Sequence, residues 1–342
     1  MRKLVLLGAL LGLVAPSGAR AVEQKSEEAA ARKRVAVAEQ WAPTIFQEVK
    51  DRRDYLAAFD FDGDWDLSNN AEHVDKFPLK AVVYYTVAET ASHWIITYLP
   101  YHPVDAKRPS GHDHDTEHVT LVVRKAGGPL GELEAMETRF HHTYYQYAAP
   151  GARVLDGADD VDGPIHFDGE HPAIHSQRVG HGLCGGHAPT AWFDALALEC
   201  DHDEAPRVGR GVVYRWKGRA EQPRSSDDRD VGYALVEIGE SLWRHARELG
   251  PHATFAKTMS FDGDRCRLFR CPTGIGSVLA AATGHASTGA LWEESSGRGV
   301  RARGEAFFDP AYTLSRRLRF AAPFSLDYEW NPYLGIGRFA TH

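Results

Sequence analysis

The stretch from residue 79 to residue 124 constrains the fold most, because it is dense in β-branched and aromatic side chains. LKAVVYYTVAE (79–89) and HWIITYLPY (93–101) are separated by the polar segment ETAS, which predicts two strands joined by a hairpin turn. VTLVVRKAGG (119–128) predicts a third strand that ends at two glycines, and FHHTYYQYA (140–148) predicts a fourth. These four segments indicate that the first half of the chain folds around a sheet.

Helical patterns are weaker and lie outside this stretch. Residues 24–50 are rich in Ala, Glu, Lys and Arg with spaced apolar positions, and predict an amphipathic helix interrupted near Pro43. Residues 233–250 (YALVEIGESLWRHARELG) predict a second helix that ends at a glycine. Segments 150–190 and 260–342 are irregular and rich in glycine. The expected fold class is therefore mainly β (α+β), with peripheral helices and long loops.

The N-terminus has the pattern of a secretory signal peptide. A positive MRK is followed by the apolar run Leu4–Val14 and by Ala19-Arg20-Ala21, which predicts cleavage after residue 21. The run is too short to span a bilayer comfortably, and no other segment is long and apolar enough to be a transmembrane helix. We expect residues 1–21 to be removed and residues 22–342 to form one exported domain, secreted or periplasmic. A buried N-terminal helix is the alternative.

Charge and cysteine content limit the partners and the compartment. The formal net charge is −8, so no overall basic field attracts nucleic acid. An even number of cysteines in an exported chain predicts two disulfides, and nearness in sequence favours Cys184–Cys200 and Cys266–Cys271. The other two connectivities and a zinc site remain alternatives, although the chain has no Cys-x-x-Cys pair.

The stretch SGHDHDTEHVTLVVRK concentrates groups that can bind a metal or carry a charge. On a strand alternate residues share a face, so Asp113, Asp115 and Glu117 continue in phase into the apolar residues that follow. Burying carboxylates costs several kcal/mol each, and a divalent cation would offset that cost, with His112 as a further ligand. Oxygen-dominated ligands favour calcium, magnesium or manganese over zinc. A solvated polar loop is the alternative.

The same stretch resembles a known family. GHDHDTE (111–117) is similar to the heptapeptide G-H-R-H-D-W-E of the necrosis- and ethylene-inducing peptide-like (NLP) proteins, and YHPVD (101–105) to the Y-x-P-x-D that precedes it. The resemblance spans roughly residues 80–185 and departs from the family at Asp113 and Thr116, where the family has Arg and Trp. FDFDGDWDLSNN and ETASHWIITYLPYHPVD also resemble a group of exported bacterial proteins that share this metal motif.

The resemblance implies a fold, a cofactor and a kind of ligand. NLP proteins are secreted cytolysins with a lectin-like β-sandwich core and a divalent cation at this motif, and the ion bridges the protein to a sugar. A glycan or lipid headgroup is therefore the expected partner, whereas toxicity and the plant sphingolipid target do not carry over. The implied metal ligands are Asp105, His112, Asp115, Glu117 and one of His141 or His142.

Other polar residues are candidates for a second cation loop and for a cleft. DFDGDWD has aspartates at alternate positions, like the start of a calcium-binding loop, but Trp65 and Ala71 stand where an EF-hand needs Gly and Glu. A solvated acidic turn is the alternative for this loop, which contains Asp60, Asp62, Asp64 and Asp66. The cleft candidates are His93, His114 and His181. The alternative for His93 is an ordinary hydrogen-bonded histidine, and for His181 a glycine-rich loop held by Cys184.

Three functions are compatible with these patterns. The first is an exported divalent-cation-binding protein whose cleft recognises a polar headgroup, sugar or lipid-linked ligand. The second is a metal-dependent hydrolase in which the ion activates water and His114, His142 or His181 is the general base. The third is a structural cation in a secreted scaffold. No G-x-S-x-G, H-E-x-x-H or phosphate-binding glycine loop is present. We favour binding on the resemblance alone.

Overall fold

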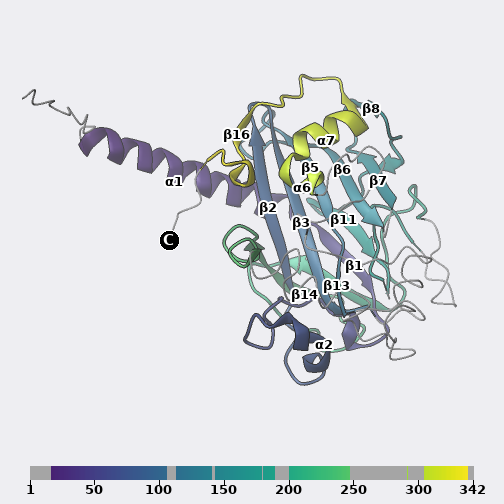
Figure 1. Cartoon of the computed structure of the whole chain (residues 1–342). Helices are drawn as coiled ribbons and strands as arrows, with labels where there is room; N and C mark the ends of the chain where they lie inside the picture. Colours follow the sequence, from purple (N-terminus) through teal and green to yellow (C-terminus); the bar gives the residue numbers. More distant parts are fainter. Residues whose placement is uncertain are drawn as a thin grey trace, which may run out of the picture.

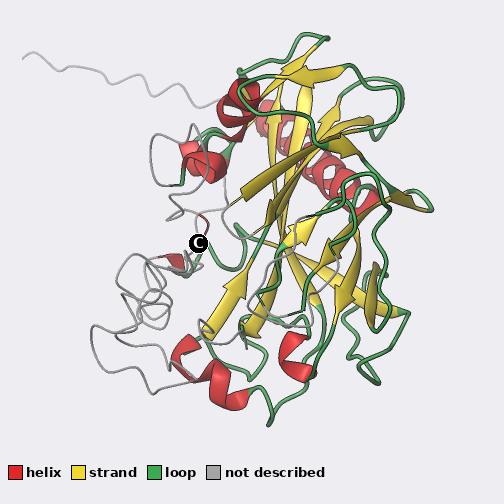
Figure 2. Ribbon diagram, turned by 90° about the vertical axis from the view of Figure 1, so that its right-hand side faces the viewer, coloured by secondary structure: helices red, strands yellow, loops and turns green. Residues whose placement is uncertain are grey.

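The computed structural model describes residues 17–105, 113–140, 143–178, 180–188, 200–246, 291 and 304–337. The expected mainly β character is confirmed. Among these residues the strands form one 14-stranded mixed sheet and a separate two-stranded ribbon. The strands extend along the length of the molecule and the few helices lie around them (Figures 1 and 2).

The elements have the following bounds. The helices are α1 (Ser17–Gln40), α2 (Asn70–His73), α6 (Glu305–Phe308) and α7 (Pro310–Arg317), and the 3-10 turns are η1 (Arg52–Asp54), η2 (Leu67–Asn69) and η4 (Pro332–Leu334). The strands are β1 (Thr44–Glu48), β2 (Val82–Thr90), β3 (His93–Val104), β4 (Asp113–Thr116), β5 (Val119–Arg124), β6 (Glu132–Phe140), β7 (Thr143–Ala148), β8 (Val154–Asp156), β9 (Gly163–Pro164), β10 (Phe167–Asp168), β11 (His171–Ser176), β12 (Leu183–Cys184), β13 (Gly211–Trp216), β14 (Val231–Glu237), β15 (Leu318–Phe320) and β16 (Tyr328–Trp330).

The sheet runs in the order β10-β11-β1-β13-β14-β2-β3-β5-β6-β7-β9, with β12 on β11, β16 on β2 and β4 on β3. Its centre contains the predicted β2–β3 hairpin, whose register runs from Val83 opposite Pro100 to Glu89 opposite Trp94. The third and fourth predicted strands are β5 and β7. The sequence-based prediction missed β6, which pairs with both of them.

The sheet curls so that its two halves share one core. Ile45 of β1 and Tyr214 of β13 belong to the same buried apolar cluster as Tyr98 of β3 and Met136 of β6. Strands at one end of the sheet therefore face strands at its centre, and this curl brings β1 opposite the end of β3. The other face of β3 and β5 is covered by α7 in a second apolar cluster (Figure 1).

Helix α1 extends away from the sheet, and only its last turns pack on the core (Figure 1). The predicted helix over 24–50 is confirmed as far as Gln40, and its interruption falls near Pro43 as predicted; beyond it the prediction is wrong, since residues 44–48 form β1. Pro43 explains the break, because proline disfavours the helical conformation of the residue before it. Residues 1–16 of the predicted signal peptide lie outside the described residues. None of the described helices is long and apolar enough to cross a membrane.

The predicted helix over 233–250 is wrong in its first part, and residue 246 is the only residue of this range that the structure describes as helical. Residues 231–237 form β14, which pairs in parallel with β13 on one side and β2 on the other. Tyr233 is buried in the core and its hydroxyl donates to the carbonyl of Pro43 at 2.7 Å. Pairing on both edges outweighs the local helical pattern, as tertiary context often does. Residues 247–250 lie outside the described residues.

Candidate functional site

The acidic motif lies on β4, which pairs with the end of β3. Asp115 is opposite His102 and Asp113 is opposite Val104. The same register continues into β5, where Val119 is opposite Tyr98. The carboxylates at 113 and 115 therefore continue in phase with the core-facing residues of β5, as the alternation in the sequence predicts.

The carboxylates of this region are buried. Asp105 is 0% exposed, Asp115 2% and Glu117 3%. Nε of Arg139 on β6 lies 3.4 Å from a carboxylate oxygen of Glu117, which gives this acid a cationic partner. Buried charges persist only with such partners or a bound ion. A solvated loop is therefore excluded for the described part of the motif.

His181 bridges two of the buried carboxylates. Its Nδ1 lies 2.8 Å from Asp115 Oδ2, and its Nε2 lies 3.3 Å from Asp54 Oδ1. Burial disfavours the charged imidazole, but the hydrogen bonds and charges of Asp115 and Asp54 outweigh burial and raise the pKa of His181 to about 10. His181 is thus an imidazolium at neutral pH and donates to both acids.

Two further buried side chains complete this group. The ring of His102 stacks on that of His181, with centroids 3.7 Å apart and planes 8° apart. Nε2 of Gln47 on β1 lies 2.8 Å from Nε2 of His102 and donates to the carbonyl of Asp54. Burial, and then the charge of His181, hold the pKa of His102 well below its usual range, so this ring is neutral. We call Gln47, Asp54, His102, Asp115 and His181 the Asp115 cluster.

Sequence reasoning found two members of the Asp115 cluster and missed three. Asp115 and His181 are in the predicted set, whereas Gln47, Asp54 and His102 are not. His102 lies inside the YHPVD segment that carries the resemblance, so a signal for it existed. Gln47 and Asp54 carry no such signal, because only the curl of the sheet brings β1 and η1 to the end of β3.

His114 lies beside the Asp115 cluster but makes different contacts. Its Nδ1 lies 2.7 Å from the Tyr101 hydroxyl, and that hydroxyl accepts from Asn70 Nδ2 at 2.9 Å. His114 therefore connects the motif to α2. His114 and His181 have φ values of 57° and 39°, in the left-handed region that non-glycine residues rarely adopt. Strain of this kind persists where the surroundings hold the residue in place, and it often accompanies functional sites.

His93, the third cleft candidate, is not in this group. It begins β3, at the end of the strand opposite to His102. Its Nε2 lies 3.1 Å from Glu134 Oε2 and its Nδ1 2.7 Å from Ser92 Oγ. Its ring packs near Phe324. These are the contacts of an ordinary hydrogen-bonded core histidine.

The predicted second cation loop forms a turn that is held by one of its own side chains and by a contact to α2. Asp62 Oδ2 lies 2.6 Å from Nδ1 of His73 on α2. Asp64 Oδ1 accepts from the backbone N–H of Asp66 at 2.7 Å, as in an Asx-turn. Asp64 and Asp66 are exposed. Cation binding by the loop of Asp60, Asp62, Asp64 and Asp66 stays a prediction.

The chemistry of the predicted metal ligands suits a hard cation, because Asp105, Asp115 and Glu117 offer buried carboxylate oxygens. Among the residues that the structure describes, however, these three do not form a group with ligand atoms within 4.8 Å of one another. The remaining predicted ligands, His112, His141 and His142, lie outside the described residues. The complete ligand set therefore stays a prediction.

Comparison with known proteins points to the family that the motif resembles. No protein-family model matches the chain. NLP effector protein 2 of Phytophthora capsici is 30% identical over 87 residues, which are 25% of this chain and 34% of that protein. The resemblance to NLP proteins is confirmed. The chain matches only about a third of the length of this NLP-like relative.

Solved NLP structures have weaker similarity to this chain. Necrosis and Ethylene inducing Protein 2 from the causal agent of cocoa's Witches Broom disease has 16% identity and a TM-score of 0.30, over 50% of this chain and 70% of that one. The non-toxic HaNLP3 protein has 15% identity and a TM-score of 0.32, over 64% and 82%. NLPPya in complex with mannosamine has 20% identity and a TM-score of 0.29, over 52% and 72%.

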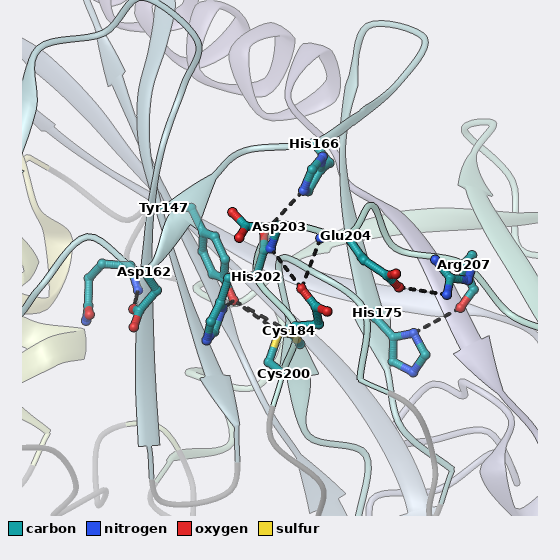
Figure 3. The surroundings of a disulfide bond; sticks show 12 residues. Tyr147, Asp162, His166, His175, Cys184, Cys200, His202, Asp203, Glu204 and Arg207 are labelled. Atoms are coloured by element: carbon teal, nitrogen blue, oxygen red, sulfur yellow. Dashed lines mark hydrogen bonds and ion pairs between the residues drawn. A yellow bond between two sulfur atoms is a disulfide. The ribbon is translucent and has the colours of Figure 1, made fainter.

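One predicted disulfide is confirmed. Cys184 and Cys200 are bonded, with Cα atoms 6.2 Å apart (Figure 3). Cys184 ends β12, and Cys200 precedes a short bridge between His187 and Asp201. The other predicted pair, Cys266 and Cys271, lies outside the described residues. A disulfide is in keeping with the predicted export of the chain.

Proposed function

We propose that this chain is an exported NLP-like protein that binds a divalent cation, and that the ion and its surroundings recognise a polar headgroup, sugar or lipid-linked ligand. Calcium, magnesium and manganese are the candidate ions. The observation that carries the proposal is the burial of the motif carboxylates beside the Asp115 cluster. The proposed ligands are Asp105, His112, Asp115, Glu117 and one of His141 or His142.

The described residues would prepare the carboxylates for an ion. His181 is hydrogen-bonded to one oxygen of Asp115, and Arg139 lies beside Glu117. These two contacts would fix the orientation of the Asp115 and Glu117 carboxylates. A bound cation would supply positive charge and an open position for hydroxyl or amine groups of a ligand. Such outer contacts fix the direction of a metal ligand, and the loss of one typically costs about 10–100-fold in metal affinity or activity.

The states of the nearby histidines favour binding over hydrolysis. A general base must be neutral at the working pH and within reach of water. His181 is charged and holds two acids, and His102 is neutral but fully buried. Nδ1 of His114 is already hydrogen-bonded to the Tyr101 hydroxyl. None of these three described histidines is a poised base, whereas a binding site does not need one.

Amino sugars are the first ligands to test, because NLPPya has been seen in complex with mannosamine and with glucosamine. Binding would be measured by titration calorimetry with the ion present and after chelation. A panel of vesicles bearing sugar and phosphate headgroups would be tested in parallel. We expect binding that requires the ion and that is lost in D115N/E117Q.

The matched control is E134Q/D168N, which alters two carboxylates outside the motif and should bind normally. Glu134 and Asp168 are each paired with an arginine elsewhere on the sheet. Ligand binding that survives chelation and D115N/E117Q would contradict the proposed role of the ion. Absence of binding to every sugar and headgroup in the presence of the ion would contradict the ligand class.

A further inference from the structure

The disulfide between Cys184 and Cys200 has an imidazole and a phenol beside it (Figure 3). Ligand atoms of Cys184, Cys200 and His202 all lie within 4.8 Å of one another, and in the described part of the chain no other three His, Cys, Asp or Glu residues do so. The Tyr147 hydroxyl lies 3.8 Å from Cys184 Sγ, 3.6 Å from Cys200 Sγ and 2.9 Å from His202 Nδ1. Two sulfurs and one imidazole therefore converge at one point.

Backbone pairing holds the two cysteine segments together independently of the sulfur–sulfur bond. Cys184 pairs with His175 of β11. Further along the chain, His187 and Asp201 exchange backbone hydrogen bonds of 2.9 and 2.8 Å, and Asp201 directly follows Cys200. Loss of the disulfide would leave these ladder contacts in place, so the two thiols would stay close.

The glycines after Cys184 let these segments approach closely. A Cβ on Gly186 would lie 2.0 Å from the carbonyl oxygen of Asp201, and one on Gly185 would lie 2.7 Å from the Tyr147 ring. Only residues without a side chain fit at these two positions. The close approach places His202 and Tyr147 against the sulfurs.

We propose that the reduced form of this chain binds zinc through Cys184, Cys200 and His202. A dithiol reductant supplies two electrons and two protons, so its own sulfurs join in a disulfide while two cysteine thiols form. Zinc then displaces the two thiol protons and takes two thiolates and one imidazole nitrogen, with water in the fourth position. Two sulfurs and a nitrogen with one open position are a recognised zinc ligand set.

This site differs in chemistry from the proposed headgroup site. Thiolate and imidazole select zinc, whereas carboxylate oxygens select calcium, magnesium or manganese. The Tyr147 hydroxyl, 2.9 Å from His202 Nδ1, would hold the imidazole ring beside the metal. The Cys184–Cys200 pair is thus a two-state element, with a disulfide in oxidising surroundings and a zinc site after reduction.

Cobalt is the probe, because cobalt bound to thiolate absorbs visible and near-ultraviolet light whereas zinc does not. The full chain would carry C266S/C271S, so that the only thiols are those of Cys184 and Cys200. It would be reduced with a dithiol, freed of the reductant without air, and checked for two thiols per chain. We expect one cobalt per reduced chain with a thiolate charge-transfer band that zinc abolishes, and no band for the oxidised chain.

Two single variants test the histidine. H202A should weaken cobalt binding about tenfold or more, since even the loss of an outer contact costs 10–100-fold. H166A removes the neighbouring imidazole, which contacts only the backbone of residue 202, and should bind cobalt like the parent. D115N/E117Q should also leave the thiolate band unchanged, which separates this proposal from the proposed function.

Three results would overturn the proposal. The first is a reduced, folded chain with two thiols and no thiolate–cobalt band. The second is equal cobalt affinity in H202A and the parent. The third is loss of the fold on reduction, measured by circular dichroism, with C184S/C200S as a second form without the disulfide. The proposal requires the backbone pairing to hold the two thiols together in the reduced chain.

Discussion

Replacing His181 with alanine tests the Asp115 cluster most sharply. The imidazolium lies between Asp115 and Asp54, at 2.8 and 3.3 Å, in a fully buried position. H181A would remove the positive charge and leave both carboxylates buried without it. We expect this variant to be strongly destabilised.

The expected cost follows from the two contacts. A hydrogen bond to a charged group contributes about 1.5–3 kcal/mol, and the longer contact to Asp54 belongs at the lower end. Breaking a buried ion pair by removing one partner costs about 3–5 kcal/mol in measured cases. Alanine does not relieve the left-handed backbone at this residue, since only glycine does so freely. We therefore expect H181A to lower the free energy of unfolding by about 3–5 kcal/mol.

Urea unfolding at pH 7 in the presence of a chelator would measure this cost without a bound ion. H175A is the matched control, because His175 is equally buried but neutral and contacts a backbone carbonyl at 3.1 Å. Its loss should cost about 1–3 kcal/mol. D115N/H181A should be more stable than H181A alone, because the uncompensated charge is also removed. A cost for H181A no larger than for H175A would refute the ionic account of this cluster.

Three further changes test the fold. Burial raises the pKa of Glu237 from its usual 4.5 to about 7. The stability that the protonated side chain contributes is therefore complete below pH 4.5 and is lost as the pH rises through 7. In urea titrations E237Q should remove this pH dependence and raise the free energy of unfolding at pH 8 by about 1–3 kcal/mol. G186A would clash with the Asp201 carbonyl and should lower the free energy of unfolding by about 1–3 kcal/mol. The added methyl of G209A meets nothing within 4 Å, so this variant should change that free energy by less than about 0.5 kcal/mol. R317M breaks an ion pair with Glu137 in which both side chains are 3% exposed. It should lower the free energy of unfolding by about 3–5 kcal/mol, and E137Q/R317M should recover part of this loss. Equal stability of R317M and E137Q/R317M would contradict the prediction.

The central strands were predictable because their residues are β-branched or aromatic and a polar turn separates them. Strand β6 was missed since ELEAMETRF carries four charges in nine residues, and its place is set by pairing with β5 and β7. Residues 233–237 of β14 were assigned to a helix because their apolar side chains fit both the helical and the strand period. Only the neighbouring strands of the sheet decide between the two.

The site was predictable only where the motif is local in sequence. Asp115 and Glu117 stand in one short run, and His181 stands in a Gly-His-Gly turn. The contact between His181 and Asp54 joins residues 127 apart, and that between Gln47 and His102 joins residues 55 apart. Such contacts arise from the curl of the sheet, which no local pattern encodes.

Metal content is the most direct test of the proposed function. The purified protein would be analysed for bound metal, and its melting temperature would be recorded before and after chelation. D115A/E117A and the control E134Q/D168N would be measured beside it. We predict one calcium, magnesium or manganese ion per chain in the parent and control, with a lower melting temperature after chelation, and no ion in D115A/E117A. A folded D115A/E117A protein with full metal content, or a parent with no metal and no response to chelation, would contradict the account.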